Sequence, residues 1–339
     1  MTTVSTLSLV NGPRFGAARM QSDLVRLTKE ITTGRHADVG LTLGAGTAMS
    51  AKLHIDLTAL SAITGSNAVA SARLSATSAA LTQAATGADA LLTQLVQARS
   101  GATWPANAAV NGLAALTSTL NATHDGGYLF AGINSSVKPF ADFDGAPKAA
   151  VEAAFQAKFG MAIGDPAVST IDAADMTDFL DNEFADLFED PAWSTWSSAA
   201  DQPLRTRVSP GQTVDTSTSA NQTAMRKLAM VYTMTAALGV DSLGAAAREV
   251  VADRAITVAG SAVSALTALR ADVDLAGKRV DDATTRVELQ QSLIETRIAT
   301  LEGVDPAEAK TRLDMLTTQI EMSYSLTAKL SQLSLLNYV

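Results

Sequence analysis

Apolar residues recur at alternating three- and four-residue steps near both ends of the chain. Residues at this spacing share one face of a helix, and that face must pack against a partner. Residues 309–339 contain no proline or glycine, and the pattern there falls on Leu313, Leu316, Ile320, Thr327, Leu330, Leu333 and Leu336. Residues 17–32 carry a matching pattern on Ala17, Met20, Leu24, Leu27 and Ile31. We therefore expect two terminal helices that pair with each other and form the assembly surface.

Two longer heptad patterns lie inside these ends. Residues 48–103 predict a long helix whose inner face carries Leu53, Leu57, Leu60, Thr64, Asn67, Ser71, Leu74, Ser78, Leu81, Ala85, Ala88, Leu92 and Leu95. Residues 245–301 mirror it with Leu266, Leu269, Val273, Ala276, Val280, Ala283, Val287, Ile294 and Leu301, and with Gln290 and Arg297 as polar gaps. The polar residues Asn67 and Ser71 would fix the helix register at some cost in stability.

The elements follow one another in nearly palindromic order. A glycine-rich connector follows Gly34, a shorter helix is expected at residues 106–123, and Gly303 and Pro306 separate the second long helix from the last one. We expect a mainly α fold, an elongated antiparallel helical bundle or coiled coil formed by the N- and C-terminal segments. The expected division is terminal segments at 1–40 and 304–339, a rod at 41–135 and 220–303, and an insertion at 136–219.

The insertion differs in composition from the rest. It holds seven of the 9 phenylalanines and two of the 3 tryptophans, enough for a small core of its own. Residues 204–208 and 213–218 alternate around Pro210 and Gly211, which predicts a hairpin and hence a small α+β domain. It also holds 14 acidic against 5 basic residues, the whole of the net charge of −9. This charge argues against nucleic-acid binding, which needs a basic face.

Several motifs resemble chemical sites, and each has a simpler interpretation. The acidic residues from Asp172 to Asp190 are spaced for the outer face of an amphipathic helix, whereas a calcium loop needs alternating ligands and a central glycine. The glycines before Thr47 lack the lysine of a phosphate loop. The three histidines lie far apart, and no Gly-x-Ser-x-Gly motif occurs. We expect no enzyme, no cofactor and no metal.

The sequence carries no conventional export or membrane signal. Residues 1–10 lack a basic segment followed by an apolar run and a cleavage site, so a cleaved signal peptide is not expected. Residues 228–240 are apolar but short and read as a buried helix. The chain has no cysteine, which excludes disulfides and thiolate sites. A soluble protein without contact to a membrane is the expectation.

The terminal helix pair predicts assembly. A pair this thin is marginal alone and keeps apolar residues on its outer faces. We expect it to order on docking with copies of the chain or with a partner.

In its pairs of terminal and long helices around an insertion, the chain resembles the flagellin and hook-associated protein superfamily of bacterial flagella. Thr33-Gly34-Arg35 is similar to the family's stop after the first helix, although the acidic element that usually follows is reduced to Asp38. Within the superfamily, the hook–filament junction members are the most similar. The similarity to them lies in residues 127–132 followed by Pro139-Phe140, in residues 211–221, and in the ending 330–339.

The resemblance implies a structural adaptor that is exported by the flagellar type III system. Its implied partners are neighbouring copies in a ring, the preceding hook-associated protein, flagellin, and an export chaperone on the C-terminal helix. Its implied location is extracellular, at the hook–filament junction. Two alternatives stay open: a flagellin that forms the filament, and a metal- or glycan-binding module carried by the insertion.

Overall fold

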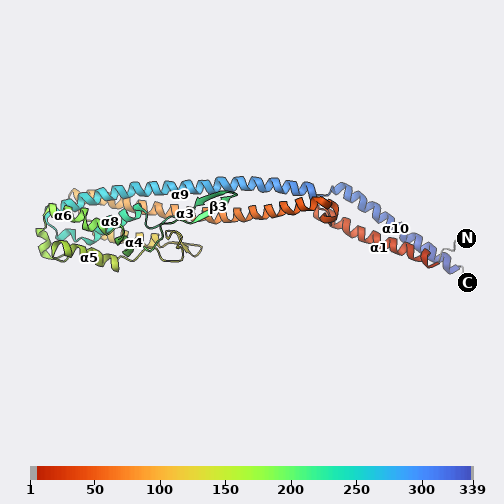
Figure 1. Ribbon diagram of the computed structural model, residues 1–339, viewed down its shortest axis with the longest axis horizontal. Helices are drawn as coiled ribbons and strands as arrows, with labels where there is room; N and C mark the ends of the chain where they lie inside the picture. The colour runs from red at the N-terminus through yellow and green to blue at the C-terminus, as the bar shows by residue number, and fades with distance from the viewer. Residues whose placement is uncertain (1–5, 337–339) are drawn as a thin grey trace. The chain divides into compact units, whose positions relative to one another are not determined.

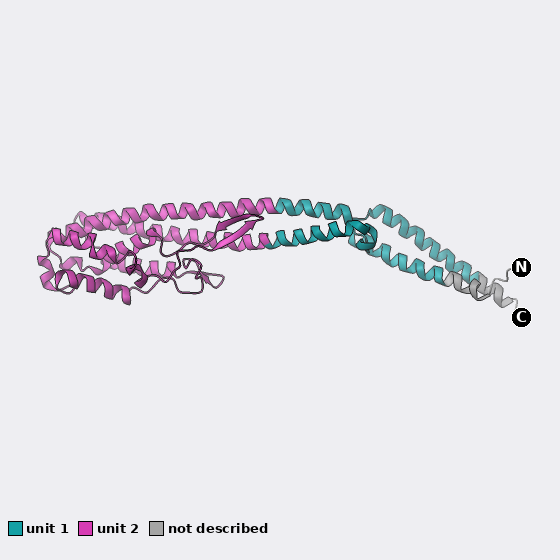
Figure 2. Cartoon of the chain, in the orientation of Figure 1, with its two compact units in different colours: residues 1–62, 288–339 teal, residues 63–287 magenta. Residues whose placement is uncertain are grey.

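The computed structural model describes the backbone of residues 6–336 and the side chains of residues 15–329. The chain packs as two compact units, of which the first joins the two ends of the chain and the second is one continuous stretch (Figure 2). Unit 1 comprises residues 1–62 and 288–339, and unit 2 comprises residues 63–287. The expectation of a mainly helical bundle with a small insertion is confirmed.

Unit 1 is built around two terminal helices, α1 (Thr6–Thr33) and α10 (Pro306–Leu336), which lie side by side (Figure 1). Gly34 ends α1 in the left-handed conformation (φ 66°) that favours glycine. The helix begins eleven residues before the predicted start at residue 17. The helix continues through Gly12 and Pro13, although a proline inside a helix removes one backbone hydrogen bond and crowds the carbonyl of residue i−4.

The glycine-rich connector after α1 contains the short helix α2 (Val39–Leu43) and a 3-10 turn, η1 (Gly44–Gly46). Asp38 caps α2, because its carboxylate accepts a hydrogen bond from the Leu41 amide at 2.9 Å. A good N-cap therefore offsets the unfavourable helix propensity of the glycines.

The long helices α3 (Thr47–Arg99) and α9 (Ala245–Glu302) pair in antiparallel register. Every seventh residue of α3 is buried, from Leu53 and Leu60 in unit 1 to Asn67, Leu74, Leu81, Ala88 and Leu95 in unit 2. In unit 2 polar side chains mark the register: Ser71 and Ser78 donate to Asp281 (3.1 Å) and Asp274 (2.6 Å). By length and composition α9 could cross a membrane, yet its inner face lies in this core.

The inner face of α9 shifts by one residue beyond Val287. The predicted polar gaps Gln290 and Arg297 are exposed, and Gln291 and Ile298 turn inward in their place. Gln291 donates to Ser61 on α3 at 3.3 Å. A straight helix of 3.6 residues per turn drifts against a strict heptad, so an extra four-residue step keeps the face on its partner.

The aromatic residues of the insertion join the core of unit 2 and do not stand apart from it. Helices α4 (Ala106–Leu120) and α8 (Thr223–Ala237) pack on each other, and one continuous buried cluster runs from Ala70 to Ala283. Within it, Trp193 and Trp196 stack with ring centroids 6.0 Å apart. Helices α5 (Ala146–Phe159), α6 (Ala173–Asp181) and α7 (Glu183–Asp186) add further rings to the cluster, and Phe179 on α6 contacts both Phe155 on α5 and Phe184 on α7.

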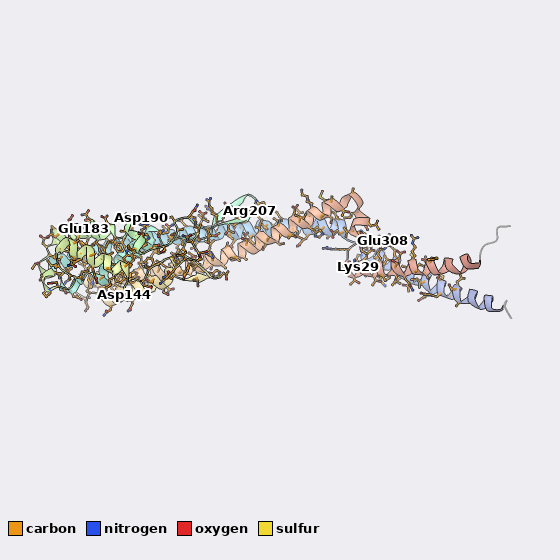
Figure 3. The ribbon with its side chains drawn as sticks, turned by 60° about the horizontal axis from the view of Figure 1, so that its bottom comes forward. Lys29, Asp144, Glu183, Asp190, Arg207 and Glu308 are labelled. Carbon is orange, nitrogen blue, oxygen red and sulfur yellow. The ribbon has the colours of Figure 1, made fainter. Side chains whose placement is uncertain are left out.

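The acidic run predicted as one helix is broken at Asn182, whose backbone (φ −115°, ψ −90°) is not helical. The break turns α7 so that Phe184 and Phe188 are buried together with Phe179. The acidic residues stay outward, as Asp190 shows (Figure 3). Aromatic burial thus decides the local backbone here, because it outweighs the continuation of a single helix.

Short strands and turns complete unit 2. Strands β3 (Arg205–Ser209) and β4 (Gln212–Asp215) form the expected hairpin around Pro210 and Gly211. A second small hairpin joins β1 (Thr123–His124) to β2 (Gly127–Tyr128). The remaining 3-10 turns are η2 (Pro166–Thr170), η3 (Ala192–Thr195) and η4 (Val240–Ser242).

Candidate assembly surface

The terminal helices bring most of the predicted assembly residues together. On α1, Leu27 is buried with 7% of its surface exposed, and Ala17, Met20, Leu24 and Ile31 are half-buried. On α10 the half-buried residues are Leu313, Leu316 and Ile320. The side chains of Leu330, Leu333 and Leu336 lie outside the described part of the chain. The inner faces of the two helices are therefore in contact, and their role in assembly stays a prediction.

A polar contact fixes how the two helices face each other. The Gln21 amide on α1 donates to the Tyr324 hydroxyl on α10 at 2.6 Å. At the end of the pair where α1 stops and α10 starts, Arg35 and Gly303 form an antiparallel bridge. The pair is therefore antiparallel and held at both of these points.

The outer face of α10 carries a second apolar stripe, an exposed face that the sequence predicted for the pair without naming its residues. Met315, Met322 and Leu326 are 60%, 59% and 60% exposed, and their spacing places them on one face. Phe15 and Val25 on α1 are also exposed. The sequence signal for this stripe was the seven-residue interval between Met315 and Met322. Met315 directly precedes Leu316, which belongs to the inner stripe. Because a two-helix layer has only one inner seam, this second stripe stays exposed among the residues that the structure describes.

The polar residues do not form a catalytic arrangement. His54 Nε2 lies 2.8 Å from Glu302 Oε1, and Ser50 Oγ donates to the same oxygen at 2.5 Å. Both groups bond to the acid, whereas a serine nucleophile needs its bond to the histidine. His36 bonds to this region only through its backbone amide, and His124 contacts Asp125 (3.5 Å). The three histidines are thus not brought together.

Many carboxylates of the insertion are used in ion pairs. Lys158 on α5 donates to Asp178 and, at 2.8 Å, to Glu183, and these bonds lower the pKa of both carboxyls. Arg254 on α9 pairs with Asp181. Within residues 6–336, no group of three or more potential ligands is placed to hold a metal ion.

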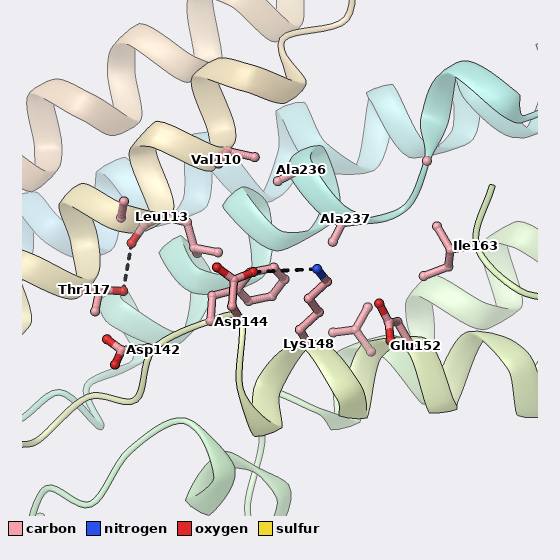
Figure 4. Close-up of a pocket in the computed structure, with 14 residues that line it drawn as sticks. Val110, Leu113, Thr117, Asp142, Asp144, Lys148, Glu152, Ile163, Ala236 and Ala237 are labelled. Atoms are coloured by element: carbon pink, nitrogen blue, oxygen red, sulfur yellow. Dashed lines mark hydrogen bonds and ion pairs between the residues drawn. The ribbon is translucent and has the colours of Figure 1, made fainter.

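A hollow of about 670 Å³ lies in unit 2 among α4, α5 and α8 (Figure 4). Its walls are mainly apolar, with Val110 and Leu113 from α4 and Ala237 from α8. Charged groups at its rim include the pair of Asp144 and Lys148, whose charged atoms are 3.7 Å apart. Asp142 and Glu152 also line the hollow, so its apolar walls carry a mainly acidic rim.

Two family models match the chain on either side of the insertion. The bacterial flagellin N-terminal helical region matches residues 4–135, and the bacterial flagellin C-terminal helical region matches residues 256–339. Together they cover more than half of the chain. The chain belongs to the flagellin superfamily. The comparison with curated proteins found no match.

Membership of this superfamily accounts for the terminal helix pair. It makes the chain a structural protein of the bacterial flagellum that assembles into the flagellar polymer, and not an enzyme. The matched regions contain α1 and α10, and with them the exposed stripe of Met315, Met322 and Leu326. This stripe therefore lies in the parts shared with flagellin.

Proposed function

We propose that this flagellar protein joins the hook to the filament, in the role of hook-associated protein 3. It would form a ring of its own copies between the preceding hook-associated protein and the first flagellin subunits. Assembly would cover the outer stripe of Met315, Met322 and Leu326, because burial of apolar surface contributes roughly 25 cal/mol per Å². The gain offsets the entropy lost when the terminal helices are ordered.

The observation that carries the junction role is the contact between the start and the end of the insertion. Both segments are similar to the junction members in sequence, and they lie against each other. The Ala220 amide donates to the Phe130 carbonyl at 2.7 Å, and Ala131 bridges Ser219. At Gly132 a Cβ atom would lie 2.3 Å from the Ala200 carbonyl oxygen, so the turn requires glycine. The side chains of the similar ending, residues 330–339, lie outside the described part of the chain.

The same surface fits an export chaperone. Before assembly an uncovered apolar stripe exposes the chain to aggregation, and a dedicated partner on α10 would cover it. We propose export by the flagellar type III system without a cleaved signal, followed by release of α10 for docking. The extracellular location at the hook–filament junction is part of this proposal.

Deletion of the gene tests the role in cells. The junction role predicts hooks that still form while flagellin is shed into the medium. Immunogold labelling of the wild-type cell should mark one band at the base of the filament. Label along the whole filament would instead support the alternative, a flagellin that forms the filament itself.

A further inference from the structure

A buried carboxylate lies in unit 1, where few side chains are buried. Glu302 is the last residue of α9, and its side chain is only 4% exposed. Burial of a charged carboxylate is strongly unfavourable unless it is paired and hydrogen-bonded. Its partners therefore have to be accounted for.

Three side chains from two other segments satisfy Glu302. Ser50 and His54 on the first turns of α3 both bond to Oε1, at 2.5 and 2.8 Å. Arg35, in the connector after α1, places Nη1 3.3 Å from Oε2. We call these four residues the Glu302 clasp. It ties the ends of α1, α3 and α9 to one carboxylate.

Backbone hydrogen bonds continue the clasp toward α10. The His36 amide donates to the Glu302 carbonyl (2.9 Å), and the Val304 amide donates to the Gly34 carbonyl (3.1 Å). Gly303, between them, fits only as glycine, because a Cβ atom there would lie 2.2 Å from the Ala299 carbonyl oxygen. The two chain breakers found in the sequence are thus bonded to each other.

We propose that the Glu302 clasp is a pH-sensitive latch that holds the connector at residues 34–36 to the α9–α10 breaker and opens when Glu302 is protonated. The inference goes beyond the junction role and does not rest on it, because the latch closes within a single chain. An open latch would free α1 and α10 from the ends of α3 and α9. It would thereby change how the terminal helices are presented for assembly.

The charges around Glu302 fix the direction of the pH effect. The hydrogen bond from Ser50 and the contacts with His54 and Arg35 lower the pKa of Glu302 below its ordinary value, against the opposing effect of burial. A lowered pKa in the folded state means that the clasp stabilises the fold above the ordinary pKa of a carboxyl and loses this effect as the pH falls through the lowered value.

The neighbouring acids are engaged elsewhere. Glu30, in the last turn of α1, accepts a hydrogen bond from the Ala37 amide at 3.1 Å. Asp305 caps α10 by accepting from the Ala307 amide at 2.8 Å. Each of these acids therefore has a backbone partner of its own, and neither bonds to Ser50, His54 or Arg35 in the contacts described above.

Hydrogen exchange at the His36 and Val304 amides tests the latch in the unassembled full-length chain. Glu302→Gln removes the charge and keeps the shape, and it should lower the protection of both amides at neutral pH by about tenfold or more, as expected for lost bonds to a charged group. The control Glu295→Gln changes an exposed acid on the same helix and should leave both amides as they are. The amide of Leu81 in unit 2 serves as an internal reference for global unfolding.

The acid arm distinguishes the latch from general acid unfolding. In the wild-type chain, protection at His36 and Val304 relative to Leu81 should fall as Glu302 is protonated, and in Glu302→Gln it should stay low throughout. Wild-type protection in Glu302→Gln, or a parallel acid loss in both chains, would overturn the proposal. If Glu302→Gln also loses protection at Leu81, the milder Arg35→Gln decides: it should lower protection at the two clasp amides alone, and unchanged protection there refutes the latch.

Discussion

The contact between Gly112 and Tyr232 sets how closely α4 and α8 approach each other. A Cβ atom at Gly112 would lie 2.2 Å from Tyr232 Cε1, and one at Gly87 on α3 would lie 3.0 Å from the Tyr232 hydroxyl oxygen. Tyr232 therefore occupies a slot between two glycines on two helices. These glycines are needed for close packing and not for backbone freedom, since both lie inside helices.

Gly112→Ala should destabilise the protein by about 1–3 kcal/mol, because the added methyl group overpacks the Tyr232 ring. The matched control is Gly260→Ala on α9, where no atom lies within 4 Å of the new methyl group. That control should be stabilising by roughly 0.5–1 kcal/mol, since alanine favours a helix interior. Urea unfolding followed by circular dichroism measures both. Equal changes in the free energy of unfolding for the two substitutions would show that Tyr232 does not need the space at Gly112.

Tyr232 should also titrate late, because burial raises its pKa to about 12. A pKa raised in the folded state means that the stabilising effect of this group is complete below about pH 10, the ordinary value, and is lost as the pH rises toward 12. The alkaline unfolding midpoint of Tyr232→Phe should therefore be higher than that of the wild-type chain, relative to their stabilities at neutral pH. Ultraviolet difference spectra of the two proteins would show the late-ionising phenol directly.

At the scale of single elements, α10 presents two apolar faces that differ in their burial. The inner face of Leu313, Leu316 and Ile320 packs on α1, whereas the outer face of Met315, Met322 and Leu326 has no cover within the described chain. A shift of one or two positions along the helix thus separates the buried face of the pair from the exposed one.

Met322→Glu should change the free energy of unfolding of the isolated chain by no more than about 0.5 kcal/mol, since the site is exposed. The same substitution should strongly reduce incorporation of the protein into the flagellum. Leu27→Ala, on the inner seam of α1, is the counterpart. It should destabilise unit 1 by roughly 1–3 kcal/mol before any assembly takes place. Circular dichroism and the amount of protein retained in purified flagella measure the two effects. Normal incorporation of Met322→Glu would show that the outer stripe is not an assembly surface.

At the scale of the whole molecule, the two units differ in how much apolar surface they bury. Unit 2 contains the continuous aromatic core from Ala70 to Ala283. Among the described residues of unit 1, the buried apolar side chains are Leu27, Leu53, Leu60, Ile298 and Ala309. Stability follows buried apolar area, so unit 1 should open first.

Limited proteolysis of the isolated chain should therefore remove α1 and α10 early and leave a resistant fragment that contains residues 63–287. Calorimetry should show two transitions, the smaller one at lower temperature and lost after this trimming. Mass spectrometry of the fragment locates its ends. A single cooperative transition, with no resistant fragment, would mean that the two units unfold together.

The sequence by itself determined the helices and their pairing partners. The heptads of α3 and α9, the inner faces of α1 and α10, and the hairpin at Pro210-Gly211 follow from local periodicity and turn chemistry, which are written in consecutive residues. The polar seam residue Asn67 was also predictable. The structure shows its amide donating to the Val208 carbonyl (2.9 Å) and to Thr284 (3.0 Å).

Only the tertiary structure decided which residues meet across long distances in the chain. The break at Asn182 depends on which aromatic rings fill the core, and the seam shift at Gln291 depends on the drift of one helix against another. The Glu302 clasp joins side chains about 250 positions apart, and no periodic pattern in either segment specifies that contact. The outer stripe of α10 is in the sequence, but its exposure is a property of the packed pair. Periodicity fixes the face that each helix buries, whereas register and packing fix which polar groups then lie within bonding distance.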